Sequence, residues 1–229
     1  MTSAFVFPGQ GSQAVGMGKE LSDSSATARA VFEEVNDALD QNLSALMFDG
    51  PIEDLTLTFN AQPALMAASI AVVRVLEAEF DVKMADVAAY TAGHSLGEYS
   101  ALAAARSLSL ADVARLLKTR GQAMQQAVPV GEGGMAALLG IGLEKATELA
   151  EAAAEGEICS PANDNGPDQV VLSGAATAID RAVEQAPDFG ARRAVLLQVS
   201  APFHCALMAP AAKVMEEALA KVDFAPPLV

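Results

Sequence analysis

A serine lies between two glycines in the segment G-H-S-L-G (Gly93–Gly97), where an apolar, strand-like run ends and a helix-like run begins. This is the G-x-S-x-G pattern, in which the glycines allow a sharp turn that lifts the serine hydroxyl above a sheet. The amide of the next residue, Leu96, would then point to the place where an oxyanion forms. The pattern favours a nucleophilic Ser95 over the alternative, an ordinary strand-to-helix turn.

A serine nucleophile needs a base, because its hydroxyl is weakly nucleophilic at its free pKa. The chain has two histidines. His94 directly precedes Ser95 in the tight turn, so its side chain should leave the backbone in another direction. His204 lies in S-A-P-F-H-C, an irregular segment of the kind that often carries catalytic side chains. A lone histidine is normally structural, but elimination favours His204 as the base. No aspartate can be assigned as a third member.

A glycine-rich loop, Gly9–Gly18, follows the first apolar run. Its G-Q-G-S-Q-A satisfies the dinucleotide fingerprint, but a helical pattern follows where that fingerprint requires a second strand ending in an acid. A phosphate-binding Walker loop is also excluded, because Lys19-Glu20 is neither the required dipeptide nor correctly spaced. We interpret the loop as a flexible segment close to Ser95. It could offer a backbone amide, or the side-chain amide of Gln10, to a substrate.

Arg120 lies in the segment K-T-R-G-Q-A-M and shares a helix face with Leu116 and Met124. The residues alone favour a surface arginine whose apolar stem packs along the helix. An arginine on an apolar face near a nucleophile would instead bind a carboxylate through two parallel (bidentate) hydrogen bonds.

In the first part of the chain, strands and helices alternate. Such alternation is typical of a parallel sheet covered by helices. The expected strands are Ala4–Phe7 and Val87–Ala92. The expected helices are Ser25–Leu39, about Pro63–Phe80 with Pro63 in its first turn, about Leu96–Ala105, and Leu110–Ala127 with Ser109 as N-cap.

After Pro129–Gly134 the order becomes strand, helix, strand, strand, helix, strand, which is the ferredoxin-like order. We predict an α/β fold: a hydrolase-like parallel sheet with helices on both faces (residues 1–130 and 199–229), carrying an inserted ferredoxin-like α+β subdomain (residues 131–198). The expected elements of the second part are Met135–Ile141, Leu143–Ala154, Ile158–Ala162, Gln169–Ser173, Ala176–Gln185, Arg193–Val199 and a last helix at about Leu207–Val222.

The composition narrows the classes of partner. The 229 residues carry a formal net charge of −15, which disfavours nucleic acid and anionic lipid surfaces. The longest uncharged apolar run is shorter than the roughly 20 residues of a membrane helix. The two cysteines match no metal or redox spacing, so we expect no metal and a reducing, cytoplasmic location.

Four segments, in this order and spacing, resemble a known family: F-V-F-P-G-Q-G-S-Q, G-H-S-L-G-E-Y-S-A-L, T-R-G-Q-A-M and P-F-H-C-A-L-M. The family is the malonyl-CoA:acyl carrier protein transacylases of type II fatty acid synthesis. The resemblance extends from the first strand to the last residue. It implies transfer of malonyl from malonyl-CoA to acyl carrier protein through a serine ester, without a cofactor. It also implies that the parent polypeptide continues beyond Val229.

The resemblance implies a role for each residue of the reacting centre. Ser95 would take the malonyl group as an ester, and His204 would activate the hydroxyl. The backbone amides of Gln10 and Leu96 would form the oxyanion hole.

The resemblance also implies binding residues. Arg120 would pair with the malonyl carboxylate, and Phe203 looks like the malonyl-selecting form of its motif. Met124, on the same helix face as Arg120, is grouped with these substrate-binding residues. Arg192 and Arg193 fall where the family presents basic residues to the acidic carrier protein.

Two other functions stay open at this point. A serine hydrolase or thioesterase would use Ser95 and His204 with water as acceptor, and a non-catalytic module would bind the carrier protein without acylation. Arg120 favours transfer over general ester hydrolysis, because an anchored carboxylate has little purpose in the latter.

Overall fold

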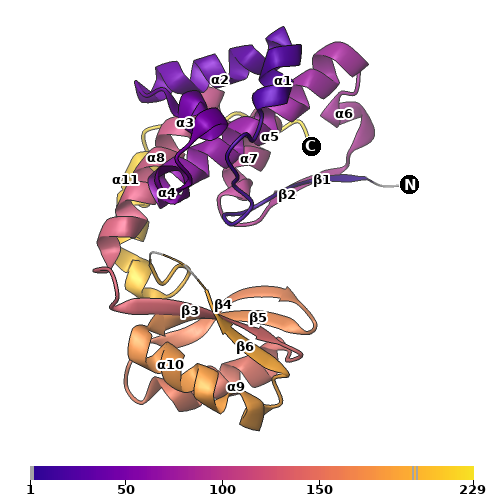
Figure 1. The fold of residues 1–229 in the computed structure, drawn as a ribbon. Helices are drawn as coiled ribbons and strands as arrows, with labels where there is room; N and C mark the ends of the chain where they lie inside the picture. Colours follow the sequence, from indigo (N-terminus) through magenta and orange to yellow (C-terminus); the bar gives the residue numbers. More distant parts are fainter. Residues whose placement is uncertain (1–2, 198, 200) are drawn as a thin grey trace. The chain divides into compact units, whose positions relative to one another are not determined.

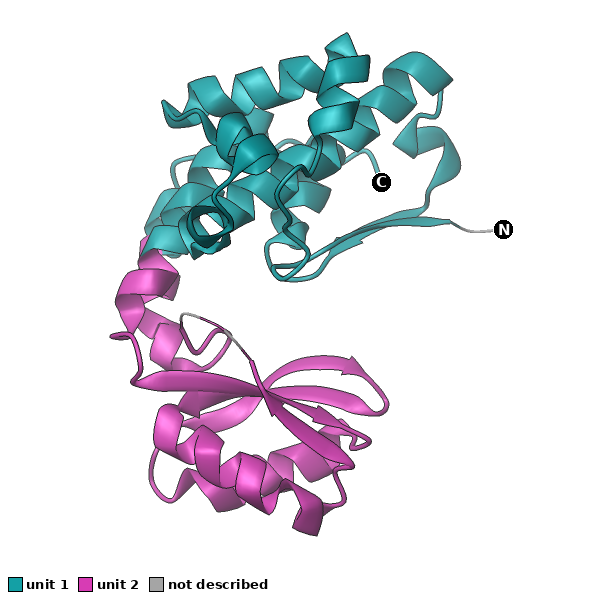
Figure 2. Cartoon of the chain, viewed as in Figure 1, with its two compact units in different colours: residues 1–122, 215–229 teal, residues 123–214 magenta. Residues whose placement is uncertain are grey.

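The structure is a computed structural model that describes residues 3–197, 199 and 201–229 (Figure 1). The chain forms two compact units (Figure 2). Unit 1 consists of residues 1–122 and 215–229, and unit 2 of residues 123–214. Together they give a mixed α/β fold with one parallel and one antiparallel sheet.

Unit 1 holds a two-stranded parallel sheet and most of the helices. Strand β1 (Ala4–Phe7) pairs with β2 (Tyr90–Gly93), with Phe7 opposite Gly93. The helices are α1 (Lys19–Ser24), α2 (Ala26–Leu39), α3 (Leu43–Asp49), α4 (Ile52–Thr56), α5 (Thr58–Phe80), α6 (Met84–Val87), α7 (Gly97–Ala104), α8 (Leu110–Ala127) and the end of α11 (Ala209–Leu219).

Helix α8 follows its predicted N-cap Ser109, and α2 begins one residue later than expected, because Ser25 is its N-cap. The hydroxyl of Ser25 accepts a hydrogen bond from the amide of Ala28 at 3.1 Å, and Ser109 accepts one from Asp112 at 3.0 Å. Both serines thereby satisfy one of the amides that a helix N-terminus leaves without a partner. The apolar face of α2 is buried in the core of unit 1, as its spacing indicates.

Helix α5 begins five residues earlier than expected, at Thr58, so Pro63 lies inside it and the first-turn prediction is wrong. By length and composition α5 could cross a membrane, but 67% of its most apolar window is buried inside the structure, as in a core helix. It is apolar on nearly all sides because other elements of unit 1 surround it. Without a polar face, its sequence has no clear period to mark its start.

The stretch expected as strand Val87–Ala92 is divided. The short helix α6 ends at Val87, and β2 starts only at Tyr90. An apolar run of this length does not by itself distinguish the last residue of a helical turn from the first of a strand.

Unit 2 holds a four-stranded antiparallel sheet in the order β4-β5-β3-β6. The predicted order of strands and helices is confirmed, and α9 and α10 have the expected bounds. The elements are β3 (Gly133–Leu139), α9 (Leu143–Ala154), β4 (Cys159–Gly166), β5 (Gln169–Ala175), α10 (Ala176–Gln185), the 3₁₀ turn η1 (Ala186–Phe189), β6 (Arg193–Leu196) and the 3₁₀ turn η2 (Ala206–Met208). Strand β6 is shorter than the expected Arg193–Val199, in which Gln198 lies outside the described residues.

Both faces of the unit 2 sheet are covered. Successive residues of β3 point to opposite faces: Leu138 packs with α9 and α10, whereas Ala137 packs with Met124 and Phe203. The end of α8 and the segment after β6 supply this second layer. Unit 2 is therefore wider than the predicted subdomain 131–198, and those boundaries stay a prediction.

Candidate active site

The predicted turn around Ser95 is present between β2 and α7. Ser95 has a φ of 54°, in the left-handed region that a non-glycine residue occupies only at a cost of about 1–2 kcal/mol. The turn is fixed by two hydrogen bonds: the amide of His94 donates to Phe7 at 3.0 Å, and that of Gly97 donates to His94 at 2.9 Å. The strained residue is therefore held by β1 and by the first turn of α7.

Two glycines make this turn possible. A side chain at Gly93 would collide with the backbone of Gly97, and one at Gly97 would collide with the carbonyl of Phe7. The chain can therefore pass from strand to helix within three residues only because both positions lack a side chain.

The oxyanion-hole candidates lie in unit 1 with Ser95. Leu96 is buried and is the N-cap of α7, where a helix leaves amides without intrahelical acceptors. Gln10 lies in the loop after β1, and its side-chain amide donates to the hydroxyl of Thr58 at 3.3 Å. The side chain of Gln10 is thus engaged with α5, which leaves its backbone amide as the group to test.

Arg120 reaches the nucleophile from α8. Its Nη2 donates to Oγ of Ser95 at 3.0 Å, and its Nη1 donates to Oε1 of Gln62 at 2.8 Å. The guanidinium carbon also lies 5.7 Å from the centre of the Tyr99 ring. The surface interpretation that the residues alone favoured is wrong, because Arg120 is largely buried in unit 1.

The guanidinium of Arg120 has no ion-pair partner in the part of the chain that the structure describes. None of the ion pairs between described residues includes Arg120. Burial lowers the pKa of its guanidinium, an effect that Tyr99 and Glu98 partly offset. An arginine remains protonated in spite of such a shift. A cation in this state, beside a nucleophile, attracts a negatively charged ligand.

Five predicted site residues lie in unit 2, and three of them are Met124, Phe203 and His204. Phe203 and Met124 are both buried and belong to one hydrophobic cluster, so the structure brings these two together. His204 follows Phe203 in the chain, is exposed, and has a φ of 60°. Ser95 and His204 belong to different units, which are described separately, so their pairing stays a prediction.

Arg192 and Arg193 lie at the start of the edge strand β6, and both are exposed. Arg192 lies 3.5 Å from a carboxylate oxygen of Asp168, an exposed pair that contributes little to stability. The two cations are therefore available to a partner.

Two residues of the site were missed from the sequence: Gln62 and Tyr99. Gln62 is a buried polar side chain within the apolar run of α5, and this contrast is the signal that could have indicated it. Tyr99 lies in the first turn of α7, directly after the G-x-S-x-G segment, and this position is the signal that could have indicated it.

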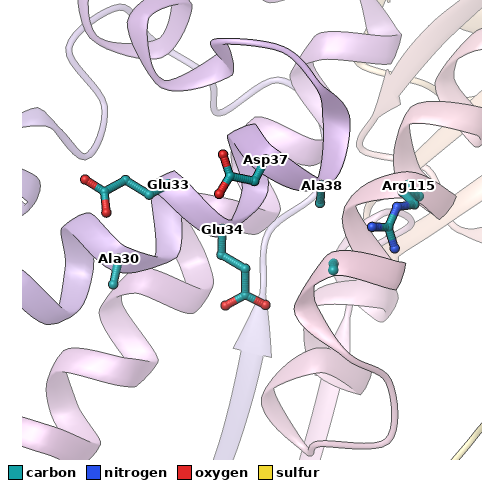
Figure 3. A pocket seen from close by; sticks show the side chains of 7 residues that line it. Ala30, Glu33, Glu34, Asp37, Ala38 and Arg115 are labelled. Carbon is teal, nitrogen blue, oxygen red and sulfur yellow. The ribbon is translucent and has the colours of Figure 1, made fainter.

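Within the described ranges, no group of three or more His, Cys, Asp and Glu side chains could hold a metal ion. A separate hollow in unit 1 lies between α2 and α8 and contains acidic side chains (Figure 3). None of the predicted site residues lines it. Its lining residues are Ala30, Glu33, Glu34, Asp37, Ala38, Ala111 and Arg115.

A serine in a strained turn beside a buried arginine suits acyl transfer through a serine ester. The chain belongs to the acyl transferase domain family, whose sequence model matches residues 4–229. It is 47% identical over 221 residues to the malonyl CoA-acyl carrier protein transacylase of Bacillus subtilis (strain 168). The aligned region covers 96% of this chain and 68% of that protein.

Solved structures agree with this assignment. The acyl-carrier-protein-S-malonyltransferase from Bartonella henselae is 56% identical, with a TM-score of 0.96 that covers 100% of this chain and 73% of that one. A malonyl-transacylase solved in complex with a type II polyketide synthase acyl carrier protein is 42% identical, with a TM-score of 0.94. The match covers 100% of this chain and 72% of that one. The 229 residues thus correspond to about 70% of the length of these relatives.

Proposed function

We propose that the protein transfers the malonyl group of malonyl-CoA to the phosphopantetheine thiol of acyl carrier protein through an ester on Ser95. The observation that carries the proposal is the contact of Arg120 with Oγ of Ser95, because it places a cation without a described ion-pair partner next to the nucleophile. A malonyl group has its thioester carbonyl and its free carboxylate only one methylene apart. One site can therefore present the carbonyl to Ser95 and the carboxylate to Arg120.

In the first half-reaction, Oγ of Ser95 attacks the thioester carbonyl while its proton passes to His204. The amides of Gln10 and Leu96 donate hydrogen bonds to the tetrahedral oxyanion. When the intermediate collapses, the carbon–sulfur bond breaks, coenzyme A leaves with the proton from His204, and malonyl remains on Ser95. The carrier thiol then attacks the ester in the same way, which regenerates the hydroxyl.

The remaining residues determine which substrates bind. Phe203 and Met124 form an apolar surface against the acyl group, and their shared cluster supports this role. Arg192 and Arg193 attract the acidic carrier protein, and their exposure on β6 supports docking. We place the protein in the cytoplasm, since both cysteines are free thiols.

We also infer the finer fold. The strand order β4-β5-β3-β6 in unit 2 supports a ferredoxin-like subdomain inserted into a hydrolase-like α/β domain. The parallel pair β1-β2, with Ser95 directly after β2, supports the hydrolase-like part.

Intact-mass spectrometry after mixing with malonyl-CoA tests the proposal, with acetyl-CoA and the Ser95→Ala variant as controls. We expect one malonyl adduct that is absent from the variant and is lost when acyl carrier protein is added. Release of free malonate without carrier would instead indicate a thioesterase. Carrier binding without any adduct would indicate a non-catalytic module.

A further inference from the structure

Gln62 is the acceptor that holds the buried arginine of the site. It lies in the second turn of α5, with only 1% of its surface exposed, and its Oε1 accepts the hydrogen bond from Nη1 of Arg120. The other guanidinium nitrogen, Nη2, reaches Ser95. One neutral side chain therefore sets the direction in which a charged group points at the nucleophile.

The meeting of Gln62 and Arg120 is fixed by the backbone. Gly121, the neighbour of Arg120 on α8, has no room for a side chain, because one would collide with the backbone of Phe59 and Thr58 on α5. The two helices thus touch backbone to backbone where they present these side chains. This close contact fixes the separation of the two helix backbones from which Gln62 and Arg120 extend.

The neutrality of Gln62 matters for what Arg120 can bind. A glutamate of the same shape would form an ion pair with the guanidinium and cancel much of its charge. An amide oxygen orients the guanidinium by one hydrogen bond and leaves the positive charge in place. Only two of the five N–H donors of an arginine are used by Gln62 and Ser95 among the described residues. The remaining donors can receive a carboxylate.

A second cation on α8 is held in the same manner and provides a comparison. Lys118 donates to Oε1 of Gln41 at 2.6 Å and to Oδ1 of Asn60 at 3.1 Å, and it lies over the ring of Phe59. These partners are neutral as well. Lys118 does not contact Ser95 in any described hydrogen bond, so the same change of charge can be made there without touching the nucleophile.

We propose that Gln62 is a positioning residue that sets the selectivity of this protein for acyl groups carrying a carboxylate. It does so by orienting Arg120 without neutralising it. This inference rests on the proposed function, since it requires that Arg120 bind the carboxylate of the acyl donor.

The test compares Gln62→Glu, which keeps the acceptor and adds a charge, with Gln62→Met, which removes the acceptor at similar volume. Gln41→Glu is the matched control at Lys118. We expect Gln62→Glu to lower the malonyl-to-acetyl ratio of kcat/KM at least about thirtyfold, since it competes with the substrate for Arg120. Gln62→Met should lower the ratio by about tenfold through lost orientation. Gln41→Glu should leave the ratio unchanged.

Two further measurements identify the cause. In an Arg120→Ala background, Gln62→Glu should have no additional effect on the ratio, because the group through which it acts is gone. Free malonate should raise the melting temperature of the wild type more than acetate does, and Gln62→Glu should abolish that difference. A ratio that Gln62→Glu leaves unchanged, in a wild type that prefers malonyl, overturns this inference alone. A wild type that forms no malonyl ester overturns the proposed function and the inference with it.

Discussion

Replacing Arg120 with alanine tests the link between the structure and substrate choice. The guanidinium is largely buried, and burial lowers its pKa, so its interactions with a ligand are only partly screened by water. Removing one partner of a buried charge pair costs about 2–5 kcal/mol. Because Arg120 keeps some exposure, we expect the lower part of that range, about 2–3 kcal/mol. This corresponds to a loss of about 30- to 150-fold in malonyl kcat/KM.

The acetyl group gives the internal reference. It has no carboxylate, so Arg120→Ala should lower acetyl transfer far less than malonyl transfer, or raise it once the buried cation is gone. Arg120 also donates to Ser95, and loss of that hydrogen bond would alter the nucleophile for both substrates alike. The ratio of the two kcat/KM values cancels this shared effect and any loss of folded protein.

The assay is stopped-flow or quench measurement of acyl-enzyme formation from malonyl-CoA and from acetyl-CoA. Arg115→Ala is the control, because Arg115 lies on the same helix, is exposed, and pairs only with Asp112 at 3.3 Å among the described residues. It should leave both rates unchanged. If Arg120→Ala lowers malonyl and acetyl transfer by the same factor, so that their ratio is unchanged, Arg120 does not bind the carboxylate.

Three more predictions concern unit 2. His204→Ala should slow acylation by about 10²–10⁴-fold, the usual contribution of a general base, and a rate equal to that of the wild type in single-turnover experiments would exclude it as the base. Arg192→Glu combined with Arg193→Glu should raise the KM for carrier protein more than that for malonyl-CoA, with a difference that shrinks in high salt. Equal effects at all salt concentrations would contradict docking. Burial raises the pKa of Cys159 to about 11, so its thiol is almost fully protonated at pH 8. Iodoacetamide should therefore alkylate it far more slowly than a free cysteine, and peptide mass mapping measures this rate. Alkylation that is already fast at pH 8 would mean that the thiol is not shielded.

The sequence predicts well those elements that carry their own local signals. Helices α8, α9 and α10 have the expected bounds, and Ser109 caps α8 as predicted. Helix α5 carries no such signal at its start, so its first residues were missed. The short helices α1, α3, α4 and α6 depend on packing within unit 1, because isolated helices of this length are unstable.

The residues of the site also differ in whether a local sequence signal or tertiary packing places them. The turn around Ser95 follows from a local pattern, since two glycines and a strand-to-helix change suffice to produce it. The contacts of Arg120 with Ser95 and Gln62 depend on how α8 crosses α5, and the three residues are far apart in the sequence. Helical periodicity identified the face of α8 on which Arg120 lies, but it does not predict which side chains contact that face. That information exists only in the tertiary packing.

The left-handed backbone of Ser95 also limits which residues could ever replace it. Threonine offers the same hydroxyl, but its branched β-carbon is a poor fit to a φ of 54°. Cysteine has no such branch and could adopt the same backbone with a thiol in place of the hydroxyl. Among side chains that carry a hydroxyl or a thiol, the turn therefore favours serine and cysteine, and a change between them alters the acyl intermediate from an ester to a thioester.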